Sequence, residues 1–136
     1  MLKFTRRALF GLAFLGSLVV TQSPLLASDL TDYTPETYDA FKASGSPFMI
    51  DFYASWCSTC QAQERVINKL RAQNPAYEAI PIIRVDWDKY GNGALVRELG
   101  IPRRSTLVIM HGEMELGRLV AQTGTAQIAE LFDLAL

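Results

Sequence analysis

Two cysteines separated by two residues, Cys57 and Cys60, lie where a short apolar segment meets a longer segment of helical pattern. Residues 48–53 are a nearly continuous apolar run, which is typical of a strand buried on both faces. Residues 58–74 carry apolar side chains at helical spacing, and Pro75 is expected to end that helix. The pair therefore predicts a sharp junction between a buried strand and the first turn of a helix.

The position of the pair at a helix start determines its expected chemistry. Unpaired backbone N–H groups and the positive end of the helix dipole stabilise a thiolate there, and the dipole alone lowers a thiol pKa by about one unit. Cys57 lies nearest the helix end and is the expected nucleophile. Cys60 lies one turn inside, where we expect it to be more buried and to resolve a mixed disulfide formed by Cys57.

Three other interpretations of the pair stay open. A disulfide that closes so short a loop constrains the unfolded chain little, so a purely structural disulfide would stabilise the fold weakly. A zinc site would need ligands from a second copy, because two cysteines and one histidine cannot fill four positions within one chain. Inert core thiols would oxidise in an exported chain. Of these possibilities we favour redox chemistry, and we expect no metal and no cofactor besides the cysteines themselves.

The start of the chain differs in composition from the rest. It carries three basic residues, Lys3, Arg6 and Arg7, followed by an apolar or small run at residues 8–20. A helix over that run spans roughly 20 Å, less than the roughly 30 Å hydrocarbon core of a membrane. The pattern predicts a signal peptide at residues 1–27, cleaved after Ala27, and a periplasmic or secreted product exported by the general or the twin-arginine route. An uncleaved membrane anchor is the alternative.

Charge argues against a nucleic-acid partner. The chain has 13 basic and 14 acidic side chains, a formal net charge of −1, and no block of lysines and arginines. Without residues 1–27, ten basic and fourteen acidic side chains remain, so the formal net charge of the mature chain is −4. We expect a mildly acidic monomer.

The remaining pattern predicts one domain at residues 28–136, of α/β class. Its order is helix, strand, helix, strand, helix, strand, strand, helix, which a mixed sheet with helices on both faces accommodates. Besides the strand and helix already given, the expected elements are a helix begun by Thr34-Pro35 and ended at Gly45-Ser46-Pro47, a strand at 80–85, a helix at 93–99, strands at 106–110 and 114–120 joined at 111–113, and a helix at 125–136.

A further set of residues carries a resemblance to a known family. The run Asp51-Phe52-Tyr53-Ala54-Ser55-Trp56-Cys57-Ser58-Thr59-Cys60 is followed by Val85-Asp86, Gly100-Ile101 and Thr106-Leu107, and by a glycine-bounded hairpin. Over essentially the whole mature domain the sequence resembles the thioredoxin family. That resemblance implies the thioredoxin-like fold, a nucleophilic Cys57, a resolving Cys60 and a buried Asp51 that helps to deprotonate Cys60.

The residues themselves add to these assignments. A carboxylate inside an apolar strand is disfavoured as a charge, so burial should raise the pKa of Asp51 toward neutrality. The alternative is an acid hydrogen-bonded at the strand end. Trp56 is expected on the substrate-facing surface, with simple packing as the alternative. Arg84 stands where the family often has a lysine near the buried acid, and a solvated charge at the strand end is its alternative.

The sequence departs from the family at three places. Ser58-Thr59 separates the cysteines, Arg65 replaces the proline that kinks the helix, and Ser105 stands at the position of the family's cis-proline. A cis bond before serine costs about 2.5–4 kcal/mol, against about 0.5–1 before proline. We therefore predict a trans Arg104–Ser105 bond, with the Ser105 hydroxyl directed toward Cys57.

Substrate contacts are assigned to the loop that contains this serine. We expect Arg103 and Arg104 to flank the site with positive charge, although both can equally be solvated loop arginines. The residues predicted to bind substrate are Trp56, Arg104, Ser105 and Thr106.

The function predicted from the sequence is that of an exported thiol–disulfide oxidoreductase that reduces or exchanges disulfides in proteins outside the cytoplasm. Glu64-Arg65 and Asn74-Pro75 resemble the C-terminal periplasmic domain of transmembrane disulfide reductases, which favours reduction with electrons from a membrane donor. The alternative is a thioredoxin-like binding module, a metal or apoprotein carrier whose dithiol holds cargo without turnover. Ser105 favours that alternative, because proline at its position discourages metal capture in the family.

Overall fold

The computed structural model describes residues 30–136, so the predicted signal peptide at residues 1–27 lies outside the described residues. Within this part of the chain, no helix is both long enough and apolar enough to cross a membrane.

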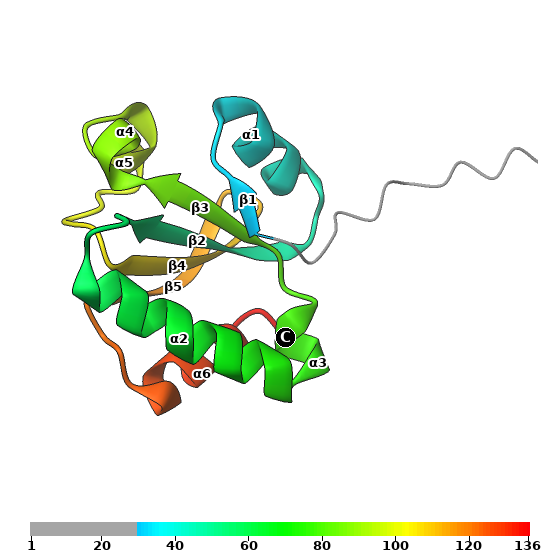
Figure 1. Cartoon of the computed structure of the whole chain (residues 1–136). Helices are drawn as coiled ribbons and strands as arrows, with labels where there is room; N and C mark the ends of the chain where they lie inside the picture. The colour runs from blue at the N-terminus through cyan, green and yellow to red at the C-terminus, as the bar shows by residue number, and fades with distance from the viewer. Residues whose placement is uncertain (1–29) are drawn as a thin grey trace, which may run out of the picture.

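A five-stranded mixed sheet forms the centre of the fold, in the order β1-β3-β2-β4-β5 (Figure 1). β1 (Leu30–Asp32), β3 (Ile82–Asp86) and β2 (Pro47–Tyr53) run parallel to one another. β4 (Thr106–His111) pairs antiparallel with β2, and β5 (Met114–Val120) pairs antiparallel with β4. The predicted mixed sheet is confirmed.

Helices cover both faces of this sheet, as predicted (Figure 1). One face is covered by α2 (Ser58–Gln73), α3 (Pro75–Glu78) and α6 (Thr125–Asp133), and the other by α1 (Pro35–Ala43), α4 (Trp87–Tyr90) and α5 (Ala94–Glu98).

Alternation along β2 divides the core between these two layers. Phe48, Ile50 and Phe52 pack in the cluster that α1 and α5 complete, whereas Met49 packs in the cluster of α2 and α6. Because successive side chains of a strand point to opposite faces, Asp51 lies on the same face as Met49. The β2 strand therefore places one carboxyl group inside the layer that α2 covers.

The first helix begins as the sequence predicts. Thr34 is its N-cap residue, and the Thr34 hydroxyl accepts a hydrogen bond from the backbone N–H of Thr37 at 3.1 Å. The Thr37 hydroxyl in turn accepts from the Thr34 N–H at 2.8 Å, which completes a capping box, and Pro35 occupies the first helical position.

The sequence missed β1, α3 and α4, which have three, four and four residues and are too short to show a periodicity. Pro75 does more than end a helix: α2 stops at Gln73, and Pro75 opens α3 with Asn74 as its N-cap residue. The strand predicted at 80–85 runs instead from Ile82 to Asp86.

Candidate active site

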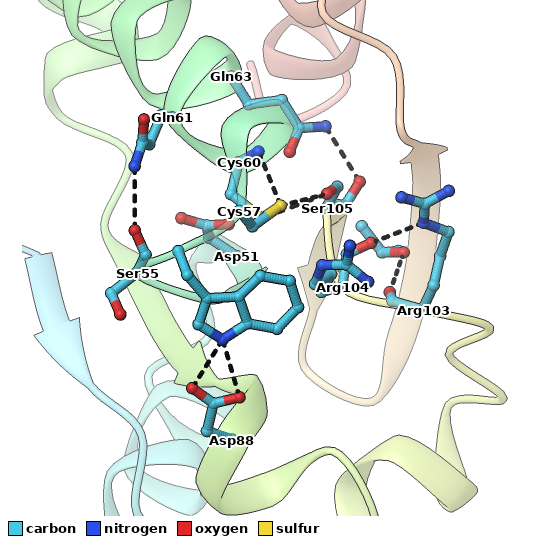
Figure 2. The surroundings of a disulfide bond; sticks show 12 residues. Asp51, Ser55, Cys57, Cys60, Gln61, Gln63, Asp88, Arg103, Arg104 and Ser105 are labelled. Carbon is cyan, nitrogen blue, oxygen red and sulfur yellow. Dashed lines mark hydrogen bonds between the residues drawn. A yellow bond between two sulfur atoms is a disulfide. The ribbon is translucent and has the colours of Figure 1, made fainter.

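The cysteine pair lies at the junction of β2 and α2, as predicted (Figure 2). Cys57 is the N-cap residue of α2, and its sulfur accepts a hydrogen bond from the backbone N–H of Cys60 at 3.2 Å. The two sulfurs form a disulfide, with the Cα atoms 5.3 Å apart. The Cys57 sulfur thus lies where the helix presents its unpaired donors, and this position stabilises a thiolate once the disulfide is reduced.

The burial of the two cysteines differs from the prediction. Cys57 is 3% exposed and Cys60 is 6% exposed, so both are buried and Cys60 is not the more buried of the two. Cys60 lines a pocket of about 240 Å³, and Cys57 does not. The other residues that line this pocket are Tyr53, Ala54, Ser55, Gln61, Glu64 and Arg84.

Ser105 lies directly against the disulfide (Figure 2). Its Oγ is 3.2 Å from the Sγ of Cys57 and 3.2 Å from the Sγ of Cys60. No peptide bond within residues 30–136 is cis, so the Arg104–Ser105 bond is trans, as predicted. Ser105 has φ of +62°, a left-handed conformation that a non-glycine residue adopts only where its surroundings hold it.

Backbone hydrogen bonds hold Ser105 in this conformation. Its N–H donates to the carbonyl oxygen of Phe52 at 2.7 Å, and its carbonyl oxygen accepts from the N–H of Ala121 at 2.8 Å. Gln63, which is 1% exposed, donates from Nε2 to the same Ser105 carbonyl at 3.0 Å and to the carbonyl oxygen of Gln122 at 2.9 Å. The loop is therefore tied to β2, to the residue after β5 and to α2.

Sequence reasoning missed Gln63, although a signal for it exists. Cys60, Gln63, Ile67 and Leu70 are buried at the three- and four-residue spacing of one helix face. A polar side chain inside such an apolar stripe needs hydrogen-bond partners in the core, and that requirement marks Gln63 as a structural anchor.

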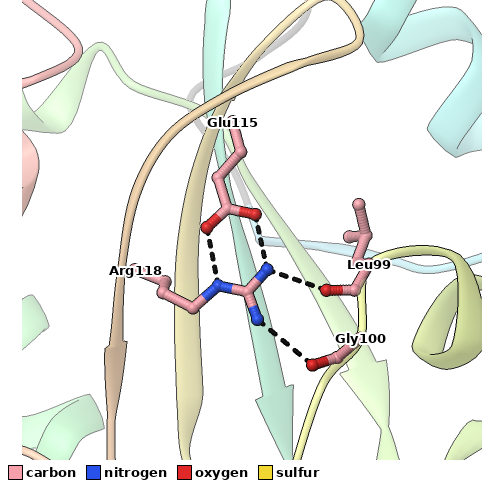
Figure 3. A network of polar contacts seen from close by, with 4 residues as sticks. All are labelled: Leu99, Gly100, Glu115 and Arg118. Atoms are coloured by element: carbon pink, nitrogen blue, oxygen red, sulfur yellow. Dashed lines mark hydrogen bonds and ion pairs between the residues drawn. The ribbon is translucent and has the colours of Figure 1, made fainter.

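The other end of the Ser105 loop is tied to β5 (Figure 3). Arg118 donates from Nη2 to the carbonyl oxygen of Leu99 at 2.8 Å and from Nη1 to that of Gly100 at 3.3 Å. Glu115 holds the same guanidinium through a two-pronged ion pair. Gly100 has φ of +60°, and the turn there leads the chain toward the disulfide.

Asp51 is buried, as predicted, and is 6% exposed. Burial raises its pKa from 3.8 to about 6, against the opposing effect of the nearby Arg84 guanidinium. Arg84 Nε lies 3.4 Å from Asp51 Oδ2, and Arg84 Nη1 lies 3.5 Å from Glu64 Oε1. The carboxylate of Glu64 also raises the pKa of Asp51, because it adds a like charge. Arg84 thus bridges a buried acid and a half-buried one at the wall of the pocket beside Cys60.

Trp56 projects from the site and is 57% exposed, which excludes simple packing in the core. Its indole nitrogen donates to both carboxylate oxygens of Asp88, at 2.9 and 3.1 Å (Figure 2). The Arg104 guanidinium lies over the indole ring, 4.4 Å from the ring centroid. Of the four residues predicted to bind substrate, Trp56 and Arg104 are the two with exposed surface.

Ser105 and Thr106 are fully buried. Ser105 contacts the sulfurs, whereas Thr106 donates from its hydroxyl to the carbonyl oxygen of Arg103 at 2.7 Å. The side chain of Thr106 therefore does not reach the surface that its predicted contact with substrate requires. It holds the loop instead.

Within residues 30–136, no group of three or more histidine, cysteine, aspartate and glutamate side chains is placed to hold a metal ion.

Two known proteins are similar to this chain in sequence. Thioredoxin Asp f 28 of Aspergillus fumigatus is 30% identical over 97 residues, which cover 71% of this chain and 84% of that protein. The thiol:disulfide interchange protein DsbE of Haemophilus influenzae is 30% identical over 92 residues, which cover 62% of this chain and 46% of that protein.

The fold also matches a solved structure, that of Trxlp from Edwardsiella tarda. The TM-score is 0.69 at 26% identity, over 76% of this chain and 98% of that one. The Thioredoxin family model matches residues 29–133, which include the whole described site. The chain belongs to the thioredoxin family and is a thiol–disulfide oxidoreductase.

Proposed function

We propose that the protein is exported and reduces disulfides in proteins outside the cytoplasm. The observation that carries the thiol–disulfide exchange in this proposal is the position of the Cys57 sulfur. It lies at the N-terminus of α2, accepts the Cys60 N–H at 3.2 Å and lies 3.2 Å from the Ser105 hydroxyl. Both donors favour a thiolate over a thiol, and the thiolate is the attacking species.

The reaction proceeds in two exchanges. The Cys57 thiolate attacks one sulfur of the substrate disulfide, a bond forms between Cys57 and that sulfur, and the other substrate sulfur leaves as a thiolate. The Cys60 thiolate then attacks the Cys57 sulfur, which restores the Cys57–Cys60 disulfide and releases the second substrate thiolate. The substrate gains two electrons and takes up two protons, and the protein loses two electrons.

Asp51 is proposed to act as the base for Cys60. Its pKa of about 6 lets it hold or release a proton near neutral pH. The pocket that Cys60, Glu64 and Arg84 line provides a route by which water reaches this part of the site. Arg84, whose Nε lies 3.4 Å from Asp51 Oδ2, also lines this pocket, so we propose that the proton leaves Asp51 through it.

Reduction is preferred to oxidation, with a membrane protein as electron donor. The preference rests on the likeness of Glu64-Arg65 and Asn74-Pro75 to periplasmic reductase domains. The relative from Haemophilus influenzae, whose name describes thiol:disulfide interchange, supports the same class of reaction. We propose that the exported chain acts as a monomer.

Insulin reduction, followed as turbidity in the presence of dithiothreitol, tests the activity. Wild-type protein should accelerate it, and Cys57→Ser should reduce the rate to that without protein. Titration against glutathione redox buffers gives the potential, and a value at or below that of the glutathione pool supports a reductase. A more oxidising value would assign the oxidase direction instead.

The same preparation tests the second candidate, a carrier of metal or apoprotein. Ser105 favours this candidate, because it offers a hydroxyl beside two sulfurs where the family has proline. If the protein is a carrier, protein purified under reducing conditions should hold stoichiometric metal or bound apoprotein and should not reduce insulin. Rapid turnover by metal-free protein excludes that role.

Export is tested in the source organism by fractionation and mass spectrometry. We expect a mature chain that begins near Ser28 in the periplasmic or secreted fraction. An intact chain from Met1 in the membrane fraction would establish an anchor, and recovery from the cytoplasm would contradict export.

A further inference from the structure

Two neighbouring cations in the loop that faces the disulfide have no carboxylate partner within residues 30–136. Arg103 and Arg104 take part in none of the ion pairs within residues 30–136; the basic residues that do are Lys42, Arg71, Arg84 and Arg118. Arg103 donates only to a backbone carbonyl, that of Arg104, at 3.3 Å. The Nε of Arg104 is buried and has no hydrogen-bond partner. Their positive charge is therefore not neutralised by the described part of the chain.

These cations lie where a substrate has to approach. Arg104 precedes Ser105, whose hydroxyl is 3.2 Å from the Cys57 sulfur. Trp56 precedes Cys57, and the Arg104 guanidinium lies over the indole ring of Trp56, 4.4 Å from its centroid. A group bound to these side chains would be adjacent to the sulfur that exchanges.

The tryptophan is held in place for such a contact. The indole is 57% exposed, yet its nitrogen donates to both oxygens of Asp88. The ring is therefore fixed, and little conformational entropy is lost when a substrate packs on it. Asp88 is engaged with the indole and does not pair with either arginine.

Positive charge is present beside the disulfide of a chain that is negative as a whole. The mature chain has a formal net charge of −4, whereas the two loop arginines add positive charge at the disulfide. We propose that Trp56, Arg103 and Arg104, here called the tryptophan–arginine surface, bind acidic residues that flank the cysteines of the target disulfide. This inference rests on the proposed function and names its substrate class.

A preference for acidic residues predicts which disulfides the protein reduces best relative to small thiols. Carboxylates next to a disulfide repel an attacking thiolate, so small thiols reduce such disulfides slowly. Guanidinium groups pair with carboxylates through charge-assisted hydrogen bonds and remove that repulsion at the site. The protein should therefore accelerate exchange most on the disulfides that are poorest substrates for thiols in solution.

The test uses three short peptides, each a symmetric disulfide dimer whose cysteine is flanked on both sides by Glu, Gln or Lys. Two rate constants are measured for each peptide, one for its reaction with the reduced full-length mature protein and one for its reaction with dithiothreitol. The first is divided by the second to give a normalised rate. This ratio removes the intrinsic reactivity of each disulfide. We expect the Glu peptide to exceed the Gln peptide by about three- to tenfold at low ionic strength, and the difference to shrink in high salt.

Variants assign the preference to these residues. In the double variant Arg103→Gln, Arg104→Gln, the normalised rates with the Glu peptide and the Gln peptide should become nearly equal, whatever happens to the absolute rates. Lys69→Gln is a control that removes one positive charge, against two in the arginine variant. Lys69 is exposed on α2, roughly 16 Å along the helix axis from Ser58, and this variant should keep the wild-type ratio.

The outcomes separate the two proposals. Equal normalised rates for the three peptides, or a preference for Lys, overturn the acidic preference and leave the oxidoreductase function standing. Absence of exchange with all three peptides overturns both. Loss of the preference in Lys69→Gln as fully as in the arginine variant would assign it to net charge and reject the tryptophan–arginine surface.

Discussion

The side-chain nitrogen of Gln63, on α2, donates to the carbonyl oxygen of Ser105 at 3.0 Å, across 42 residues of sequence. The helix that carries the cysteines and the loop that faces them are thereby joined by one buried carboxamide. Since the same nitrogen also donates to the Gln122 carbonyl, it spans both ends of the hairpin formed by β4 and β5. This link adds to the backbone hydrogen bonds that hold Ser105 against the sulfurs.

Replacement of Gln63 by leucine should therefore change both stability and chemistry. Two buried carbonyls lose a donor, which should lower the free energy of unfolding by about 1–3 kcal/mol. The Cys57 pKa should rise, because the Ser105 hydroxyl is no longer held against its sulfur. Urea unfolding and thiolate absorbance measure the two effects.

Gln61→Leu is the control for this variant. Gln61 is also on α2 and also donates to a carbonyl, that of Ser55 at 3.0 Å, but this contact is exposed. We expect a change within about 0.5 kcal/mol and the wild-type Cys57 pKa. A Gln63→Leu protein that is destabilised but titrates like wild type would confine Gln63 to a structural role.

Removal of the Ser105 hydroxyl should raise the Cys57 pKa by about one unit, since a hydrogen bond to a charged group contributes roughly 1.5 kcal/mol or more. Absorbance of the thiolate across pH, in the reduced Ser105→Ala protein, measures it. Ser58→Ala, which removes an exposed hydroxyl one residue after Cys57, serves as the comparison. Identical titration curves for wild type and Ser105→Ala would contradict the assigned contact.

Asp51 should make stability depend on pH. Its pKa is 3.8 in the unfolded chain and about 6 in the fold, so well below pH 3.8 both states are protonated and its burial has no electrostatic cost. As the pH rises above 4, the unfolded state ionises first and is favoured, up to about 3 kcal/mol once the pH exceeds 6. Asp51→Asn removes that cost.

The expected result is that Asp51→Asn gains stability relative to wild type between pH 4 and pH 6.5 and keeps that gain at higher pH. Chemical unfolding at intervals from pH 3.5 to pH 8 measures the difference. A difference between the two proteins that is constant over this range would show that the carboxyl does not titrate differently in the fold.

The division of roles between the cysteines predicts different trapping behaviour. Cys60→Ser keeps the attack by Cys57 and cannot resolve the product, so mixed disulfides with substrate proteins should accumulate. Cys57→Ser should trap few or none, because Cys60 lacks the position at the end of the helix. Non-reducing gels of the two tagged variants make the comparison, and equal trapping would reverse the assignment.

The junction of β2 and α2 could be predicted from the sequence, because an apolar run, a helical pattern and two cysteines lie within one local segment. The sequence also located Ser105, through the departure from the family's proline. Asp51 and Arg84 face each other only because β2 and β3 pair in the register that sets Asp51 opposite Arg84. A register between strands is a tertiary property, and local pattern does not determine it.

Contacts at long range explain the remaining differences. The partner of Trp56 is Asp88, 32 residues later on α4, a helix of four residues without a readable pattern. Thr106 belongs to a motif of the family, but only the folded loop shows that its hydroxyl turns inward to Arg103. Burial likewise depends on which loops cover the helix start, and so the order of exposure of Cys57 and Cys60 was predicted wrongly.

The Ser105 hydroxyl lies at the same distance, 3.2 Å, from both sulfurs, yet it carries a single hydrogen. It can donate to only one sulfur at a time, so any stabilisation of one thiolate is withheld from the other. In the reduced protein the two thiols therefore compete for one proton donor. Because the hydroxyl stabilises only one thiolate, the second thiol loses its proton at a higher pH. The two pKa values of the dithiol therefore lie further apart.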